Sequence, residues 1–267
     1  MYKLNHYEYK LPIYIYFIYI ILIMLIVKFG KNRVIIAIAV ISLLSLISLA
    51  LAPYEYECYW IEPPYENQNT YPEDGTEKWM YTDPEDPSFY RIFADADKEL
   101  GMARLEAYEI GNDFPPVYAW AEFNTNPPPG NSPQVIGERE GDMFQCGADF
   151  YTDGYLIGSE PNAESMVSFT IYVYYWDPFE GWKCMDKKIC QFSSWDHGGE
   201  FREWIQVMTS WYYLEPNVKY SMAIKVKVGA YTTVSSTQNI CAWADFRSND
   251  YYIYVRDMWI DVLRWKP

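Results

Sequence analysis

Three acidic side chains near residue 97 have a spacing that suits the binding of a divalent cation. Asp95, Asp97 and Glu99 stand at alternate positions, and Glu106 follows at the twelfth position counted from Asp95. Calcium takes about six to eight oxygen ligands, so an acidic loop of this kind is a candidate calcium site. An EF-hand is excluded, because its invariant glycine would fall at Leu100. A solvated acidic turn is the alternative interpretation.

Aromatic side chains are the second group that could bind a ligand. The sequence has 27 tyrosines and 11 tryptophans, and all the tryptophans follow Ala52. In two segments that alternate as strands do, one side is aliphatic and the opposite side is aromatic. The aromatic positions are Tyr118 and Trp120 in one segment and Tyr172, Tyr174 and Trp176 in the other. Such rows could stack against sugar rings, meet another subunit, or lie under the segment 53–90.

All the cysteines follow the apolar N-terminal region, namely Cys58, Cys146, Cys184, Cys190 and Cys241. Disulfides persist in oxidising compartments, so this placement suits an exported domain. A turn at residues 185–188 would let Cys184 pair with Cys190, and Cys146 could pair with Cys241 across a sandwich, which leaves Cys58 free or paired between chains. The alternative is a set of buried thiols in a reducing compartment. Zinc is not expected, because residues 53–267 contain a single histidine.

Catalytic motifs are weak in this sequence. The segment 193–200 (SSWDHGGE) contains the residue types of a hydrolytic triad. Triad members normally converge from separate segments, so their presence in one glycine-containing stretch is more typical of a turn. The chain also lacks G-x-S-x-G, G-x-G-x-x-G, Walker A and H-E-x-x-H motifs. A hydrolase of polysaccharide or peptide is therefore an alternative and not the main expectation.

Two uncharged apolar runs, residues 11–27 and 34–52, dominate the N-terminal region, and the cationic hexapeptide 28–33 separates them. As a helix the second run would be about 28 Å long, close to the hydrocarbon thickness of a bilayer. The positive-inside rule places the hexapeptide in the cytoplasm and the rest of the chain outside. We expect a cell-membrane protein with one or two N-terminal transmembrane helices, the single-span form being a signal-anchor. The alternative is secretion after signal cleavage, with Met24 as an alternative start.

The charge of the chain is unevenly distributed. Residues 1–52 carry five basic residues and one acidic residue, a balance of +4, so the total of −15 leaves −19 for residues 53–267. An acidic body is a poor match for phosphate backbones, which excludes nucleic acid as a partner. The expected partners are the membrane, through the N-terminal helices, and a glycan or protein at the cell surface, including another copy of this chain.

The rest of the chain divides at about residue 90. Residues 53–90 contain six prolines among acids and aromatics, which predicts a stalk or an arm that wraps on the domain. Residues 91–267 alternate with a period of two in several segments, including 103–107, 117–123, 167–175 and 218–228. Without a convincing amphipathic helix after Ala52, this pattern predicts an all-β domain, an antiparallel β-sandwich or jelly roll.

The last third of the chain contains a turn, LEPNVKY at 214–220, that leads into a long strand, and a terminal strand with WIDV at 259–262. This order of features resembles the galactose-binding-like jelly roll of carbohydrate-binding modules, although the motifs are too short to assign the family. Taken together, the sequence predicts a membrane-anchored extracellular β-sandwich, held by disulfides, that acts in adhesion, surface assembly or carbohydrate binding. A structural subunit of a surface layer or filament, with an exposed edge strand, is a further alternative. No cofactor is expected beyond calcium.

Overall fold

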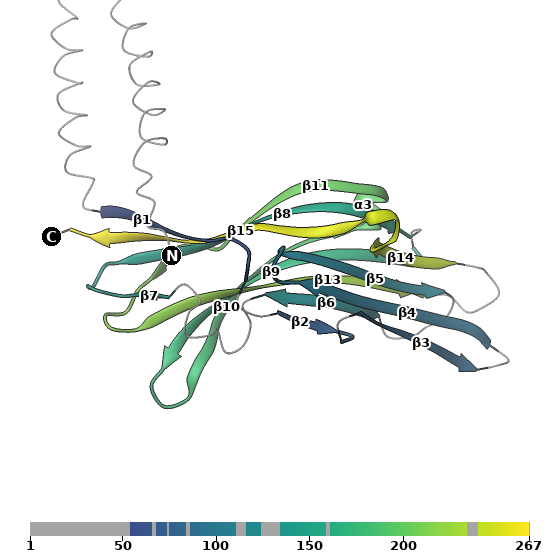
Figure 1. The fold of residues 1–267 in the computed structure, drawn as a ribbon, viewed down its shortest axis with the longest axis horizontal. Coiled ribbons are helices and arrows are strands. Elements are labelled where there is room, and N and C mark those ends of the chain that lie inside the picture. Colours follow the sequence, from purple (N-terminus) through teal and green to yellow (C-terminus); the bar gives the residue numbers. More distant parts are fainter. Residues whose placement is uncertain are drawn as a thin grey trace, which may run out of the picture.

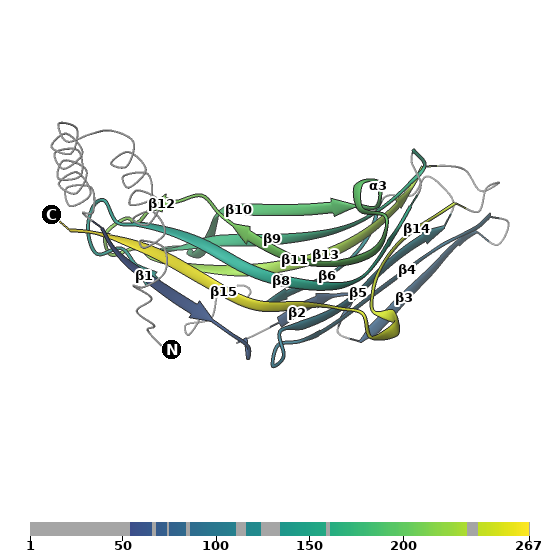
Figure 2. The ribbon, with the colours of Figure 1, turned by 90° about the horizontal axis from the view of Figure 1, so that it is seen from above.

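The computed structural model describes residues 54–266 apart from gaps at 66–67, 74, 84–85, 111–115, 124–133, 159–160 and 234–239. In this part the chain forms two antiparallel sheets that pack face to face (Figures 1 and 2). The predicted antiparallel β-sandwich is confirmed. Two short helices also occur, α3 (Ser194–His197) and the 3-10 helix η2 (Ser248–Asp250), and both connect strands.

Nine strands of the described chain form the first sheet, in the order β1-β15-β8-β14-β5-β4-β3, and β11 and β12 also pair with β8. Six strands form the second sheet, in the order β10-β9-β13-β6-β2, and β7 pairs with β13. The strands of the first sheet are β1 (Tyr54–Ile61), β3 (Thr76–Asp83), β4 (Asp86–Asp97), β5 (Met102–Ile110), β8 (Met143–Ile157), β11 (Gly199–Met208), β12 (Tyr212–Tyr213), β14 (Cys241–Phe246) and β15 (Tyr252–Trp265). Those of the second are β2 (Gln68–Tyr71), β6 (Val117–Phe123), β7 (Val135–Ile136), β9 (Ala163–Asp177), β10 (Gly181–Ser193) and β13 (Lys219–Thr232).

The core lies between the two sheets, where alternate residues of the central strands point inward. The inward residues of β13 include Met222, Ile224 and Val226, and all three are fully buried. Phe150 of β8 and Phe169 of β9 meet across the interface with ring centroids 4.8 Å apart. The period-two pattern therefore identified the buried face of each central strand, and it leaves the opposite face of each sheet for solvent or a ligand.

Residues 54–83 are built into both sheets, which corrects the expected stalk. β1 pairs with β15 in the first sheet, and β2 pairs with β6 in the second. Tyr65, in the connection between β1 and β2, is 2% exposed and packs on Phe123 with ring centroids 5.4 Å apart. β4 runs through the boundary expected at residue 90. The described residues of this segment are therefore strands and connections of the sandwich itself.

The two apolar runs at 11–27 and 34–52 lie outside the described residues, as does the hexapeptide between them. Among the residues that the structure describes, no helix is both long and apolar enough to cross a bilayer. The predicted membrane segments therefore stay predictions from the sequence alone.

Neither predicted disulfide is present. Cys146, Cys184, Cys190 and Cys241 are all free thiols. Cys184 and Cys190 lie six residues apart on the one strand β10, roughly 20 Å at about 3.3 Å per residue, whereas bridged Cα atoms lie within about 7 Å. Cys146 lies eleven residues along β8 from Ile157, which is opposite Trp243 of β14, so Cys241 is also far out of reach.

These thiols are expected to react with an alkylating reagent when the protein is denatured without reductant. In the folded protein the exposed Cys184 should react first, and Cys146 should react only on unfolding, because it is fully buried and burial raises the pKa of its thiol. Peptide mass mapping of the alkylated sites measures this. Recovery of a Cys184–Cys190 or Cys146–Cys241 peptide pair would contradict the structure.

Candidate functional site

The outer side of the second sheet gathers all the aromatic residues that the sequence indicated. β13 lies between β6 and β9 and fixes their relative register. Trp120 of β6 is opposite Lys227, whereas Tyr172 of β9 is opposite Ala223, four residues further along the same side of β13. The two aromatic rows therefore follow a diagonal across the sheet. We name this surface the aromatic–lysine face and define it by Tyr118, Trp120, Tyr172, Tyr174, Trp176, Lys225 and Lys227.

Lysine side chains cover the rings at the β6 end of this face. The Nζ atom of Lys225 lies 3.9 Å from the ring centroid of Trp120, and that of Lys227 lies 3.3 Å from the ring centroid of Tyr118. Tyr71 of β2 stacks beside Trp120 with centroids 6.2 Å apart and planes inclined by 24°. Cation–π contacts of this kind order both partners. This end is therefore a preformed cluster of rings and ammonium groups.

The β9 end of the face is more open. The rings of Tyr172 and Tyr174 lie 6.3 Å apart, and Trp176 makes an edge contact with Trp182 of β10 at 5.5 Å. Trp176 is 41% exposed, and Phe179 at the tip of the β9–β10 hairpin is 96% exposed. Apolar rings so accessible to solvent usually mark a contact surface.

Glu122 of β6 connects the two ends electrostatically. Its carboxylate forms an ion pair with Lys225, Nζ to Oε1 2.7 Å. Burial raises the pKa of the Tyr172 and Tyr174 hydroxyls, and the charges of Glu122 and Cys184 raise both further. Both tyrosines therefore stay protonated at neutral pH, and their hydroxyl groups can donate hydrogen bonds on this face.

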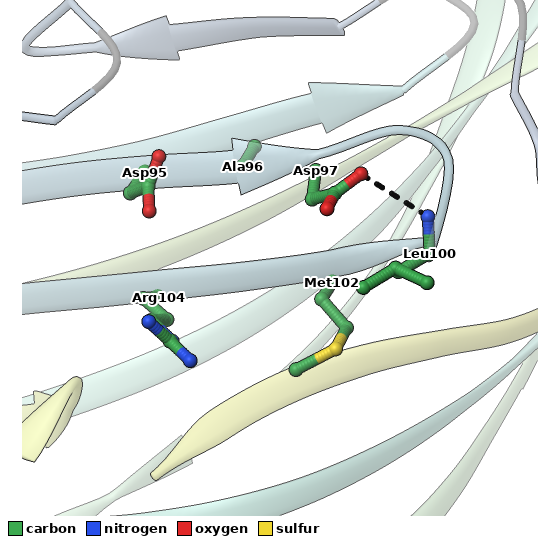
Figure 3. Close-up of a pocket in the computed structure, with 6 residues that line it drawn as sticks. All are labelled: Asp95, Ala96, Asp97, Leu100, Met102 and Arg104. Carbon is green, nitrogen blue, oxygen red and sulfur yellow. Dashed lines mark hydrogen bonds between the residues drawn. The ribbon is translucent and has the colours of Figure 1, made fainter. Parts of the chain in front are cut away.

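The predicted calcium residues do not gather into a cluster of ligands in the described part of the chain. Asp97 ends β4, and its Oδ1 accepts the backbone N–H groups of Glu99 at 2.9 Å and Leu100 at 3.2 Å, so it closes the turn (Figure 3). Asp95 stands opposite Arg104 of β5. No group of three or more potential ligands gathers among the described residues. The turn hydrogen bonds of Asp97 favour the alternative interpretation, a solvated acidic turn, and calcium binding stays a prediction from the sequence.

Asp95, Asp97 and Arg104 line a shallow depression together with Ala96, Leu100 and Met102, which Figure 3 shows. Its volume is about 130 Å³. Sites that enclose a small-molecule ligand have volumes of roughly 300 to 1,000 Å³. The depression is therefore too small to surround a substrate of that size.

The segment 193–200, which contains serine, aspartate and histidine, makes contacts that stabilise the fold. The hydroxyl of Ser193 accepts the backbone N–H of Trp195 and caps α3. The ring of His197 makes edge contacts with Phe192 at 5.1 Å and Phe201 at 6.0 Å. These contacts fasten the connection between β10 and β11 to the aromatic edge of the core.

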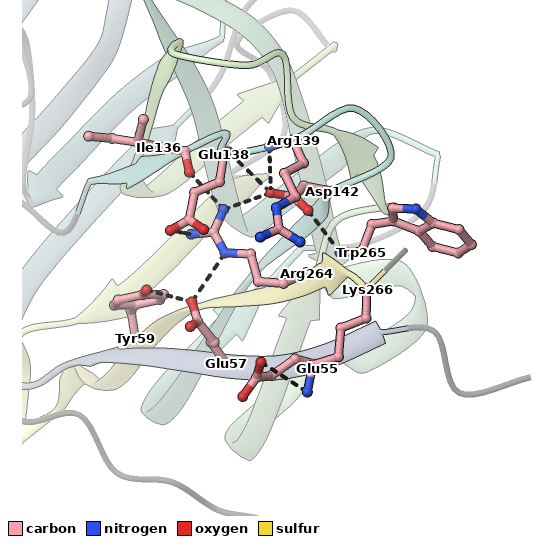
Figure 4. Close-up of polar contacts among 10 residues, drawn as sticks. All are labelled: Glu55, Glu57, Tyr59, Ile136, Glu138, Arg139, Asp142, Arg264, Trp265 and Lys266. Atoms are coloured by element: carbon pink, nitrogen blue, oxygen red, sulfur yellow. Dashed lines mark hydrogen bonds and ion pairs between the residues drawn. The ribbon is translucent and has the colours of Figure 1, made fainter. Parts of the chain in front are cut away.

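A dense set of polar contacts lies where β1, β15 and the loop before β8 meet (Figure 4). Asp142 is fully buried and accepts hydrogen bonds from Arg264 Nη1 at 3.0 Å and from the N–H of Trp265 at 2.8 Å. It also accepts the N–H groups of Glu138 and Arg139. We name these residues the Asp142 hub. Because these contacts join β15 to the loop before β8, the hub holds the strands together.

One aromatic row was missed by the sequence reasoning. On the outer side of the first sheet, Trp204 of β11 is 61% exposed and packs 4.9 Å from Tyr151 of β8. Tyr252 of β15 continues the row, 6.0 Å from Tyr151. The sequence could have indicated this row, because the aromatic residues Tyr151 and Tyr155 alternate with the buried residues Phe150 and Leu156 along β8. This second row provides a natural control surface for tests of the aromatic–lysine face.

The chemistry available on the aromatic–lysine face is stacking on exposed rings, hydrogen bonding by tyrosine hydroxyls and attraction of anions by ammonium groups. None of these groups is arranged as a nucleophile with a base. The chain matches no protein-family model. No curated protein matches its sequence.

Proposed function

We propose that the protein is a membrane-anchored, extracellular binding module that recognises carbohydrate through the aromatic–lysine face. The observation that carries the proposal is the placement of both aromatic rows on the outer side of one sheet, joined by the register of β13. Sugar rings present apolar C–H faces that stack on aromatic rings and hydroxyl groups that pair with tyrosine hydroxyls and lysine ammonium groups.

The shape of the surface supports binding over catalysis. An enclosed ligand needs a cleft, whereas an extended polysaccharide chain can lie along an open sheet and contact several strands in turn. The diagonal from Tyr118 to Trp176 crosses β6, β13 and β9. The depression at Asp97 is too small to enclose a substrate, and Asp97 itself is occupied by turn hydrogen bonds. A hydrolase is therefore the weaker candidate.

The cellular setting in this proposal comes from the sequence. β1 begins at Tyr54, two residues after the apolar run 34–52, so a membrane anchor would join the sandwich directly at that strand. The cationic hexapeptide favours a cytoplasmic loop and an outward-facing domain. We include one or two transmembrane helices and a jelly-roll-like sandwich in the proposal, with secretion after cleavage as the alternative.

Surface assembly with like subunits is a second candidate, favoured by the strand β10. In the described part of the chain β10 pairs with β9 alone and has an open edge over 13 residues. Lys183, Lys187 and Lys188 lie on this strand, and a bulge interrupts it between Cys184 and Asp186. Charges and bulges are devices that discourage edge pairing, so the edge supports assembly less well than the aromatic rows support glycan binding.

Removing an aromatic ring from the face should weaken glycan binding. In the full-length protein in nanodiscs, Trp120→Ala or Trp176→Ala is expected to lower the affinity for a bound glycan roughly five- to tenfold, because a ring contact contributes about 1 kcal/mol. A glycan array finds the ligand, and titration calorimetry measures the affinities. Trp204→Ala, on the outer side of the other sheet, is the control and should leave the affinity unchanged. Absence of any bound glycan, or equal losses in all the variants, would overturn the proposal.

A further inference from the structure

We propose that the ligand of the aromatic–lysine face is an acidic glycan, a chain that carries carboxylate or sulfate groups, and that Lys227 and Lys225 bind its anionic groups. This inference rests on the proposed function and adds a substrate class to it. It follows from the lysines on this face, which the sequence reasoning had not singled out.

The lysines stand out against the charge of the molecule. Residues 53–267 carry a net charge of −19. Yet the positions of β13 that point outward between the aromatic rows include Lys225 and Lys227, and Lys78 of β3 lies 4.7 Å over the ring of Tyr71 next to Trp120. Three ammonium groups therefore converge on the rings at the β6 end of the face. In an acidic protein such a cluster is a local reversal of charge.

The ammonium group of Lys227 lacks an anionic partner among the described residues. Lys225 is paired with Glu122, but no described carboxylate lies within 4.0 Å of Lys227. Lys227 is half-buried against the ring of Tyr118. The carboxylate of Glu164 lies near Tyr118 but forms no ion pair with Lys227. A partly desolvated cation without a counter-ion is costly, and a ligand anion would supply the missing partner.

The electrostatics of Lys227 point the same way. Burial lowers the pKa of its ammonium group, and the neighbouring charge of Lys225 lowers it further. Both effects disfavour the charged form in the free protein. An anionic group placed between the two lysines would relieve the repulsion and stabilise both charges, and a neutral sugar would not.

The rings and the lysines would act together. In the free protein the ammonium groups lie over the faces of Tyr118 and Trp120. A carboxylate or sulfate that attracts these ammonium groups would draw them away from the rings and leave the faces open for the sugar. The same event therefore makes the ion pair and exposes the stacking surface. A neutral sugar must compete with the lysines for those ring faces.

Paired oligosaccharides test this inference. Each member of a panel of uronate-bearing and sulfated oligosaccharides is compared with its methyl-esterified or desulfated counterpart, using full-length protein in nanodiscs and titration calorimetry. At least one acidic member is expected to bind at least tenfold more tightly than its neutral counterpart, and its affinity should fall as salt is raised. Lys227→Gln should reduce that preference to less than threefold. Lys98→Gln removes the same charge from the turn after β4 and should leave the preference unchanged.

The outcomes separate this inference from the proposed function. Equal binding of acidic and neutral members, with Trp120→Ala still weakening both, would overturn the acidic-glycan inference and leave carbohydrate binding in place. A preference that survives Lys227→Gln would equally overturn the inference, because it assigns the anion to that side chain. Binding of no panel member, acidic or neutral, would overturn both. Tryptophan fluorescence of each variant verifies that the sandwich is folded.

Discussion

Asp142→Ala is expected to destabilise the sandwich by about 3 to 5 kcal/mol, the range for removing one partner of a buried ion pair. The substitution would leave the guanidinium of Arg264 without its shortest carboxylate contact, 3.0 Å, and leave the N–H groups of Trp265, Glu138 and Arg139 without an acceptor. Urea unfolding followed by tryptophan fluorescence measures the change. All the tryptophans follow Ala52, so the signal reports on the β domain alone.

The contribution of Asp142 should also depend on pH in a defined direction. Burial alone would raise the pKa of this carboxyl, but the hydrogen bonds from Trp265, Arg264, Glu138 and Arg139 outweigh it and lower the pKa. Its stabilisation is therefore fully present above the unfolded value of about 3.9 and is lost as pH falls through the lower folded pKa. Glu140→Ala, an exposed acid two residues away, is the control. A stability for Asp142→Ala within about 0.5 kcal/mol of the parent would contradict the assigned role.

Glu109→Gln is expected to make the protein more stable at neutral and alkaline pH. Glu109 points into the core at the end of β5 and is 1% exposed. Its Oε1 accepts the hydroxyl of Thr232 at 3.1 Å, and its Oε2 has no hydrogen-bond partner among the described residues. Burial raises the pKa of Glu109 to about 7, although the hydrogen bonds from Thr232 act in the opposite direction. The folded protein therefore holds a proton there that the unfolded chain releases near pH 4 to 5.

The sign of the effect follows from that difference. As pH rises from about 4.5 to about 7 the unfolded state loses its proton first, so the free energy of unfolding falls by on the order of 3 kcal/mol. Glutamine cannot ionise, so this part of the pH dependence should disappear in the variant. Unfolding curves at pH 5, 6, 7 and 8 measure the slope, with Glu99→Gln in an exposed turn as the control. The same slope in Glu109→Gln as in the parent would show that Glu109 does not titrate in this window.

The central strands could be predicted from alternation, but the first strands could not. Prolines at 63, 64, 72 and 84 suggested a stalk because they were counted over a window of sequence. The structure places those at 63, 64 and 72 between strands, in the connections from β1 to β2 and from β2 to β3. Proline cannot donate a hydrogen bond to a sheet, so it marks the ends of short strands as well as it marks extended linkers. The positions of the prolines indicated where the short strands end, whereas their number suggested only an extended segment.

The turn predicted at residues 185–188 is wrong for a different reason. These residues (MDKK) read as a polar loop, yet they lie within the edge strand β10. The true turn is at 177–181, where Asp177 accepts the N–H groups of Phe179 and Glu180 and Gly181 adopts a φ of 79°. An edge strand exposed along much of its length does not alternate in polarity, so period-two reasoning fails there. Because residues 185–188 form no turn, Cys184 and Cys190 are not brought together and the predicted disulfide between them is absent.

The sequence indicated which aromatic residues belong to the candidate site, but it did not indicate how they are arranged relative to one another. Alternation alone places Tyr118 and Trp120, and likewise Tyr172 and Tyr174, on the non-core side of their strands. Alternation does not show that β13 lies between β6 and β9. It also does not give the register of these strands, which depends on their long-range pairing with β13. For the same reason Lys225 and Lys227 read as ordinary outward residues of a buried strand. Only the assembled sheet shows that they cover the predicted rings.

The pairing of β1 with β15 has a mechanical consequence. The two strands run antiparallel through eight residue pairs, from Tyr54 opposite Trp265 to Ile61 opposite Met258. Tension that enters through the chain before Tyr54, and is resisted by a ligand held on the opposite sheet, would pull along the axis of β1. The hydrogen bonds of the pair would then share the load in shear instead of opening one at a time. The ion pair between Arg264 and Glu57, 3.3 Å, joins the same two strands. In the proposed anchored protein, the β1–β15 pair would therefore carry the load between the membrane anchor and the ligand.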